Sequence, residues 1–315
     1  MKRNILLLCF MLIASVICAQ RNNTDSLLKL INLHRSDTAE VIALAYLGSQ
    51  QTQMDSAIIY AQRGIALAEK LNYLRGKGYC LLTLSWNSGS DFGKSLQFAL
   101  KALDLFENIN DKAGMASAHL VLQGVFWSAG DYKNSLVHAF AGEKIARNNN
   151  IKGVTIFPKQ RLAPLFLAEI GQVYLLRNQL DSAEFYAKKS IEQNEIFNGA
   201  KWNFPVYLLA YVQTMKGDYV PALNNFHYAL SLAKSNTFFR DTLQIFSGLS
   251  TLFKKMGKTD SSIYYAQLTV HSVNLEPEKK SLLEALTNLA EGYKVKGEKD
   301  SVIKYIEFIN GSKIE

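Results

Sequence analysis

Cysteine is almost absent from this chain of 315 residues. Two of its three cysteines, Cys9 and Cys18, lie in the first 19 residues, and only Cys80 lies beyond them. A chain from which these first residues have been removed therefore has no intramolecular disulfide. Its stability has to come from packing, and a hydrophobic content of 48% provides ample material for a core. With only 5 prolines and 19 glycines, the composition also excludes a collagen-like or low-complexity protein.

The chain also lacks blocks of like charge, and it lacks long apolar runs after its first residues. The net charge of +8 is scattered, without any stretch of five or six like charges, so the sequence does not indicate a nucleic-acid interface. Beyond Ala19, no apolar stretch approaches the roughly 18 residues that a membrane-spanning helix needs. We therefore expect the processed chain to have no nucleic-acid partner and no membrane span.

Motifs for catalysis, cofactors or metals are missing as well. The five histidines form no HExxH motif or cysteine–histidine cluster, and each stands alone in its own predicted element. We interpret His119, at an inward-facing position, as a core residue rather than a metal ligand. Ser231 and Lys234 have the S-x-x-K spacing of penicillin-binding enzymes, but the companion SDN and KTG motifs are absent. Cys80 is expected to be a small buried side chain. We expect a protein that is not an enzyme and has no cofactor or metal.

The first residues, MKRNILLLCFMLIASVICAQ, are organised like a secretory signal peptide. A positively charged start precedes an apolar run from Ile5 to Cys18, and Ala19 is a small residue at its end. We predict that residues 1–19 are the signal peptide, that cleavage follows Ala19, and that the protein is exported to the periplasm. A lipoprotein with a lipid on Cys18 is the less favoured alternative, because Ile17 stands where a small residue is needed.

What the sequence does contain is an internal repeat. The heptapeptide DSAIIYA at 55–61 returns as DSAEFYA at 181–187, as DSSIYYA at 260–266 and as DSVIKYI at 300–306, with three variants between them. The third residue of these four copies and the corresponding residue of the three variants give seven anchors, at steps of 38 to 48 residues: Ala57, Ser95, Ser135, Ala183, Ala222, Ser262 and Val302. The residue 13 positions before each anchor is Leu or Ile in all seven copies: Leu44, Leu82, Leu122, Ile170, Leu209, Leu249 and Leu289.

Each repeat predicts a pair of helices, because apolar residues at helical spacing precede and follow a short break. The break carries residues that tolerate the left-handed conformation with which many helices end: Gly130, Asn178, Gly217, Gly257 and Gly297. The aspartates that follow are expected to be the N-caps of the second helices: Asp55, Asp181, Asp260 and Asp300.

One repeat resembles the tetratricopeptide (TPR) pattern W-x-x-L-G-x-x-Y followed by a small residue, through Leu167, Ile170, Gly171, Tyr174 and Ala183. A second stretch repeats it through Leu286, Leu289, Ala290 and Tyr293. The resemblance implies an all-α fold, a right-handed superhelical solenoid of about seven TPR-like helical hairpins. The period is near 40 residues rather than the family's usual length of about 34, which implies longer second helices or linkers.

These observations divide the chain into a signal peptide, an N-terminal short helix or cap at 20–37, and the TPR solenoid at 38–310. The expected repeats are 38–71, 76–110, 112–148, 162–197, 203–236, 241–275 and 279–310. The step of 48 residues indicates an insertion at 147–163. This insertion is either a tolerated surface loop or a functional one.

The resemblance also implies a binding surface on the inner face of the solenoid. In this family the first helix of each repeat lines that face, through the second, fifth, ninth and twelfth positions. Transferred to this sequence, these positions give the candidates Ile42, Tyr46, Asn87, Trp127, Gln172, Tyr207, Tyr211, Gln244, Thr251, Lys254, Glu291 and Lys294. Aromatic and amide side chains suit an extended peptide. The alternative, above all for Tyr207 and Tyr211, is that the rings only stack on neighbouring helices.

A signal peptide followed by seven such repeats is similar to the exported N-terminal region of Bacteroidetes membrane-bound regulators of the histidine kinase or LuxR type. The resemblance implies a non-catalytic module that binds a protein or peptide as the sensory region of such a regulator. This sequence contains no output domain, so the alternative is a free-standing periplasmic scaffold or assembly factor for an envelope or secretion complex. Ile303, Ile306, Phe308 and Ile309 of the last helix are expected to need cover from a continuation of the chain or from a partner.

Overall fold

The computed structural model describes residues 27–29, 31, 36–50, 53–89, 91–151, 161–196, 202–236, 239–272 and 279–311. Helices and short turns make up these described residues, without a β-strand, and the prediction of an all-α fold is confirmed. The predicted signal peptide lies outside the described residues, and so does most of the segment 20–37. Of that segment, residues 27–29 and 31 are helical, and the buried Ile31 packs against Leu44 and Leu47.

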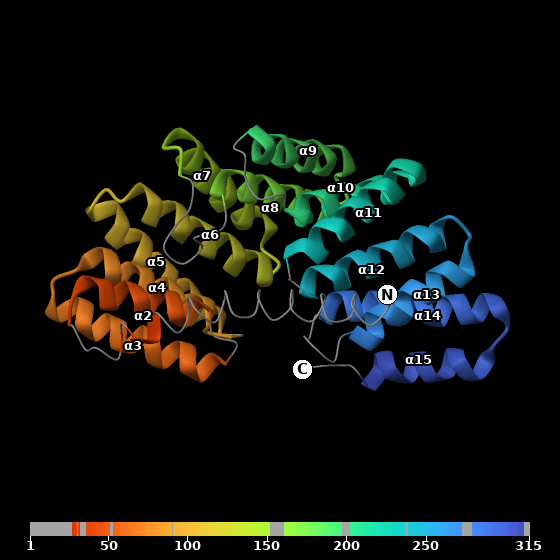
Figure 1. Ribbon diagram of the computed structural model, residues 1–315, viewed down its shortest axis with the longest axis horizontal. Helices are drawn as coiled ribbons and strands as arrows, with labels where there is room; N and C mark the ends of the chain where they lie inside the picture. Colours follow the sequence, from red (N-terminus) through yellow and green to blue (C-terminus); the bar gives the residue numbers. More distant parts are fainter. Residues whose placement is uncertain are drawn as a thin grey trace, which may run out of the picture. The chain divides into compact units, whose positions relative to one another are not determined.

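The described helices pair into seven helical hairpins, in which a short turn joins a first helix to a second helix (Figure 1). In chain order they are α2 (Thr38–Gln50) with α3 (Met54–Lys70), α4 (Leu74–Trp86) with α5 (Phe92–Asn108), α6 (Lys112–Ser128) with α7 (Tyr132–Asn148), α8 (Leu162–Leu176) with α9 (Leu180–Ile196), α10 (Asn203–Lys216) with α11 (Tyr219–Asn236), α12 (Phe239–Lys255) with α13 (Thr259–Ser272), and α14 (Lys279–Lys296) with α15 (Lys299–Gly311).

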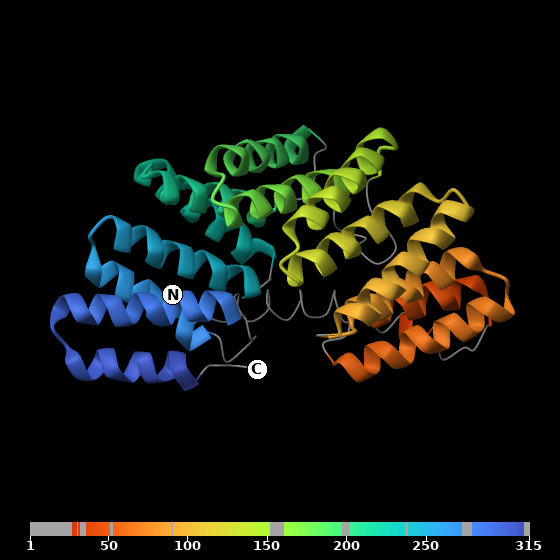
Figure 2. The same cartoon turned by 180° about the vertical axis from the view of Figure 1, so that it is seen from behind.

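The chain forms two compact units, residues 1–162 and 163–315. In the first unit, the first helices α2, α4 and α6 pack on one another in order, and the second helices α3 and α5 each pack against the first helix that follows. In the second unit, α10, α12 and α14 form the same kind of layer, with α9, α11 and α13 packed against the first helix that follows each of them. Figures 1 and 2 show this order within each unit from opposite sides.

The segment predicted as an insertion at 147–163 lies where the two units join. Helix α7 continues to Asn148 and α8 begins at Leu162, so the connection is shorter than the predicted one. Residues 152–160 of it lie outside the described part of the chain.

The residues that reveal the repeat in the sequence form the contact between the two helices of a hairpin. All seven Leu and Ile residues are buried, and so are the anchors except Val302, which is half-buried. Where the anchor is a serine, its hydroxyl can bond to the backbone of the first helix. The Ser95 hydroxyl donates to the carbonyl of Ser85 at 2.7 Å, and the Ser135 hydroxyl donates to that of Gln123 at 3.2 Å. A small anchor therefore allows close approach and leaves no polar group unsatisfied.

Four hairpins have a second contact in common, a stacked pair of rings between the first and the second helix. The pairs are Phe126 with His138, Tyr174 with Tyr186, Phe253 with Tyr265, and Tyr293 with Tyr305. Their centroids lie 5.3 to 5.7 Å apart and their planes are within 10° of parallel. In the fifth hairpin a hydrogen bond replaces the stack, because Asn225 Nδ2 donates to Gln213 Oε1 at 2.8 Å from the same repeat positions. These contacts hold the two helices in one register.

Five of the seven first helices end as the sequence predicts. Asn178 and the glycines at 130, 217, 257 and 297 have positive φ angles, from 57° to 90°. Asparagines at 72, 110 and 150 end three second helices in the same conformation, which the repeat pattern did not indicate. Since an asparagine tolerates positive φ better than most residues, both kinds of helix end are encoded locally.

The prediction that four aspartates are N-caps is wrong. Asp55, Asp181, Asp260 and Asp300 lie one residue inside the helix, in its first turn. Their carboxylates still lie near the positive end of the helix dipole. Two of them also pair with a lysine at the end of the next first helix, Asp181 with Lys216 at 2.8 Å and Asp260 with Lys296 at 2.7 Å. The recurring aspartate thus also links successive hairpins.

True aspartate N-caps occur in two of the three variant repeats. The Asp91 carboxylate accepts from the backbone N–H of Lys94 at 3.0 Å, and that of Asp131 accepts from the N–H of Asn134 at 3.1 Å. These backbone hydrogen bonds lower the pKa of both carboxyl groups, because they favour the charged form.

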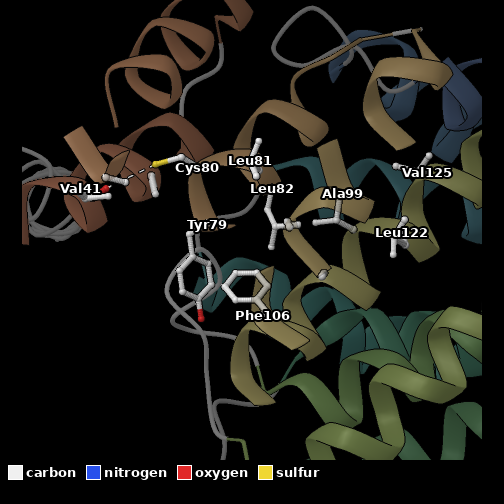
Figure 3. Close-up of a cluster of buried hydrophobic side chains, with 14 residues drawn as sticks. Val41, Tyr79, Cys80, Leu81, Leu82, Ala99, Phe106, Leu122 and Val125 are labelled. Atoms are coloured by element: carbon white, nitrogen blue, oxygen red, sulfur yellow. Dashed lines mark hydrogen bonds between the residues drawn. The ribbon is translucent and has the colours of Figure 1, made fainter. Parts of the chain in front are cut away.

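The core of the first unit depends on a close fit between Phe106 and two glycines. Phe106 is fully buried, and its ring lies 5.0 Å from that of Tyr79 (Figure 3). A Cβ atom added at Gly78 or Gly114 would lie within 2.6 or 2.1 Å of the Phe106 ring. Phe106 of α5 therefore fills the space that α4 and α6 leave open, because glycine has no side chain at these two positions.

Candidate functional site

A row of four aromatic side chains runs along α10. We call Trp202, Phe204, Tyr207 and Tyr211 the aromatic row, and all four are half-buried. Their consecutive ring centroids lie 5.4, 6.4 and 6.0 Å apart. Tyr207 also packs against the buried ring of Phe226 in α11, at 6.2 Å. The rings of Tyr207 and Tyr211 thus pack within the protein and remain partly exposed.

The aromatic row ends at a carboxylate that connects three consecutive first helices. Glu284 of α14 accepts hydrogen bonds from the hydroxyls of Tyr211 in α10, at 2.6 Å, and of Thr251 in α12, also at 2.6 Å. Its second oxygen accepts from the hydroxyl of Ser247 in α12, at 2.8 Å. We call these four residues the Glu284 cluster. Ser247 and Thr251 are buried, and Tyr211 and Glu284 are half-buried. We call the aromatic row and the Glu284 cluster together the first-helix face; it belongs to α10, α12 and α14 and lies entirely in the second unit.

The electrostatics of the Glu284 cluster follow from burial. Burial, with the Glu284 carboxylate beside it, raises the pKa of the Tyr211 hydroxyl, so Tyr211 remains a donor at neutral pH. Below the cluster, the buried Asn288 donates to Thr251 Oγ1 at 3.0 Å and to Ser250 Oγ at 3.1 Å. This side-chain amide holds the hydroxyl of Thr251 in place, which leaves the Thr251 proton for Glu284.

The sequence-predicted candidates of the first unit do not converge. Ile42 is half-buried and packs against the hydrophobic core of the first unit. Tyr46 and Trp127 are also half-buried. The Trp127 Nε1 atom is buried and makes no hydrogen bond with the described residues. Asn87 is the C-cap of α4, and its amide donates to the carbonyl of Thr83 at 2.9 Å, so the helix end occupies it.

In the second unit, the structure brings two pairs of candidates together: Tyr211 and Thr251 through Glu284, and Lys254 and Glu291 in an ion pair. Gln172 and Gln244 are half-buried, and Lys254 forms an ion pair with Glu291 at 3.0 Å. Lys294 is exposed. Two members of the cluster, Ser247 and Glu284, were missed. Both stand at positions that the repeat pattern assigns to the inner face, the fifth of the sixth repeat and the second of the seventh, so the same signal could have found them.

A pair of histidines was also missed, because each stands alone in its helix. His119 of α6 and His138 of α7 have their Nδ1 atoms 3.0 Å apart. Burial, and then the neighbouring His138, lowers the pKa of His119 to about 4, and burial lowers that of His138. The interpretation of His119 as a packed residue agrees with this geometry.

The other reactive side chains that the sequence offers are occupied or buried. Burial raises the pKa of the Cys80 thiol to about 12. The exposed Ser231 donates to the carbonyl of Tyr228 at 2.7 Å, one helical turn back, and the side chain of Lys234 lies outside the described residues. Among the described residues, no group of three or more His, Cys, Asp or Glu side chains is arranged to hold a metal ion. None of the described helices is long and apolar enough to cross a membrane.

No protein-family model and no curated protein matches this sequence. Solved structures do match its fold. The apo form of RapI has a TM-score of 0.66 and 13% identity, over 86% of this chain and 96% of that chain. The Rap conjugation gene regulator of plasmid pLS20, in complex with the Phr* peptide, has a TM-score of 0.64 and 12% identity, over 87% and 73% of the two chains.

A signal transduction ATPase from Pyrococcus horikoshii with a tetratricopeptide repeat sensor has a TM-score of 0.63 and 13% identity. The match covers 87% of this chain and 42% of that chain. At these identities, the likeness shows a TPR-like repeat fold.

Proposed function

We propose that this chain is a non-catalytic module that binds a peptide, or an extended segment of another protein, on its first-helix face. The observation that carries this proposal is the aromatic row of α10 leading to the Glu284 cluster. Partly exposed rings bury ligand area at a low cost in side-chain entropy. The half-buried Glu284 carboxylate at the end of the row can accept hydrogen bonds from the polar groups of a peptide.

The likeness to a Rap regulator that is in complex with a peptide supports this proposal. Stacked helical hairpins offer one long surface made of consecutive first helices, and an extended ligand can contact several of them at once. In this chain three such helices, α10, α12 and α14, contribute to a single hydrogen-bonded cluster. Neither a nucleic acid nor a cofactor is part of the proposed function.

The binding experiment uses a random peptide library displayed on phage and the purified chain without residues 1–19. We expect peptides to be enriched, and we expect Phe204→Ala to weaken their binding about tenfold, because the variant removes a ring that contacts the ligand. Phe204 is half-buried on α10.

The matched control is Tyr264→Ala, which removes an exposed ring from the second helix α13. It is expected to leave binding unchanged. If Phe204→Ala and Tyr264→Ala behave alike while both variants retain the wild-type helical signal in circular dichroism, the first-helix face is not the binding site.

The finer part of the proposal is that the module is exported and serves as the sensory or partner-binding region of a Bacteroidetes-type signalling regulator. The signal-peptide pattern of residues 1–19 and the resemblance of the repeat arrangement support it. Fractionated source cells probed with antibody to this chain test it. A much larger membrane-bound band is expected, whereas a soluble periplasmic band near the mass of the processed chain would favour a free-standing scaffold.

A further inference from the structure

We propose that Glu284 accepts a cationic side chain of the ligand, an arginine guanidinium, and so selects peptides in which arginine adjoins aromatic or apolar residues. This inference rests on the proposed function and adds the chemical class of the ligand. It follows from the charge of Glu284, from the geometry of its donors and from the rings beside it.

The negative charge of Glu284 is not neutralised by the described residues. Its partners are the hydroxyls of Tyr211, Ser247 and Thr251, and no ion pair joins it to a described lysine, arginine or histidine. Glu291 of the same helix, in contrast, is paired with Lys254 at 3.0 Å. The three hydroxyl hydrogen bonds offset part of the hydration that this half-buried carboxylate loses, but they supply no opposite charge. A cation that arrives with the ligand would supply that charge.

The carboxylate is already oriented for such a partner. Its two oxygens offer about four acceptor positions, and the three hydroxyl groups use three of them. One oxygen accepts from two hydroxyls and the other from Ser247 alone, so the second has an acceptor position left. Because the three helices hold the donors in place before binding, the ligand does not have to order this site.

The neighbouring rings favour a guanidinium over a compact ammonium group. Tyr211 donates its hydroxyl to Glu284, and the ring of Tyr207 follows one turn away at 6.0 Å. A planar guanidinium can bond to a carboxylate with its edge and stack on an aromatic ring with its face. The other two rings of the aromatic row, Trp202 and Phe204, continue along α10 and would contact apolar residues next to the arginine.

The experiment is a thermodynamic cycle on peptides selected from the random library. Each selected peptide is synthesised with arginine and with citrulline, which has nearly the same shape without the charge. Dissociation constants are measured for the wild-type chain and for Glu284→Gln. We expect citrulline and Glu284→Gln each to weaken binding about 10- to 100-fold, since each removes one charge of the ion pair and leaves weaker hydrogen bonds. The citrulline peptide should bind Glu284→Gln little more weakly than either single change predicts, because both changes remove the same arginine–Glu284 ion pair.

Glutamine suits this test because it keeps the size of the side chain and can still accept from Tyr211 and Thr251. The Ser247 hydroxyl can rotate to accept from the new amide. The matched control is Glu307→Gln on α15, which changes the net charge equally at an exposed position of a second helix. Glu307→Gln is expected to leave the affinities for the arginine peptide and for the citrulline peptide unchanged.

The outcomes separate this inference from the proposed function. Selected peptides whose binding is weakened by Phe204→Ala but not by citrulline or Glu284→Gln would overturn the inference and leave the proposed function standing. A library that yields no binding peptide would overturn both.

Discussion

At the scale of single residues, the His119–His138 pair stands where another hairpin has aromatic rings. The two histidines lie 16 positions before and three after the anchor Ser135, and Phe246 and Tyr265 lie at the same offsets from Ser262. The ring centroids are 5.3 Å apart in the first pair and 6.1 Å in the second. The histidines therefore pack as aromatic residues, but they can also take up protons.

The stability of the chain should consequently decrease in weak acid. The pKa of His119 is about 4 in the folded state, against 6.5 when unperturbed, so the unfolded chain binds more protons between these values. The contribution of His119 to the free energy of unfolding is therefore complete above pH 6.5 and is lost as the pH falls towards 4. His119 alone should lower the free energy of unfolding by about 2 kcal/mol between pH 7 and pH 5. Urea unfolding at the two pH values measures it.

His119→Phe, which copies Phe246, should reduce this dependence on pH by about the same amount. His227→Gln, a change at an exposed histidine, is the control and should preserve it. An equal decrease in the wild type and in His119→Phe would show that the pair does not titrate in this way.

At the scale of helices, glycines set how closely neighbours pack, and α6 offers two that differ in their surroundings. A Cβ at Gly114 would lie 2.1 Å from the buried Phe106 ring, whereas a Cβ at Gly124 would meet only Trp86, at 3.8 Å. The repeat pattern does not predict this difference in surroundings, because neither glycine is an anchor.

Gly114→Ala and Gly124→Ala should therefore have opposite effects. Gly114→Ala forces Phe106 or the two helices to move and should destabilise the chain by about 1 to 3 kcal/mol. Gly124→Ala should stabilise it by up to about 1 kcal/mol, since alanine is the better helix former and has room. Chemical denaturation followed by circular dichroism measures both, and effects of the same sign would contradict the close fit around Phe106.

At the scale of the whole molecule, the last hairpin differs from the others in its exposure. Ile303 and Phe308 of α15 are more than half exposed and Ile306 is 45% exposed, whereas Ile263 and Ala266 of α13 are buried between successive first helices. α15 packs on α14, and α13 packs on both α12 and α14.

Hydrogen exchange should reflect this difference. The backbone amides of α15 are expected to exchange faster than those of α13 in the isolated monomer, because less apolar burial opposes local opening. Mass spectrometry on peptic fragments measures both helices in one sample, so that α13 serves as the internal reference. Protection of α15 equal to that of α13 would show that the last hairpin is as stable as an internal one.

The sequence predicted the hairpins well because their signals are local. The anchor Ala183 and Ile170 lie 13 positions apart in one hairpin, and the left-handed Asn178 lies between them. The N-cap prediction was wrong by two residues, because the N-cap of α3 is Gln53 rather than Asp55 and an aspartate is favourable both at the N-cap and in the first turn. The pairing of Asp181 with Lys216 involves two hairpins, and no signal within one repeat contains it.

By itself, therefore, the sequence determined that this chain folds into helical hairpins, where five of the seven first helices end, and which small residues allow the two helices of a hairpin to touch. Only the tertiary structure decided which side chains of different helices meet. Tyr211 and Glu284 are 73 residues apart, and His119 and His138 belong to different helices. The reason is physical: hydrophobic periodicity specifies which face of a helix is buried, whereas the register between helices depends on how particular rings, glycines and hydroxyls fit together.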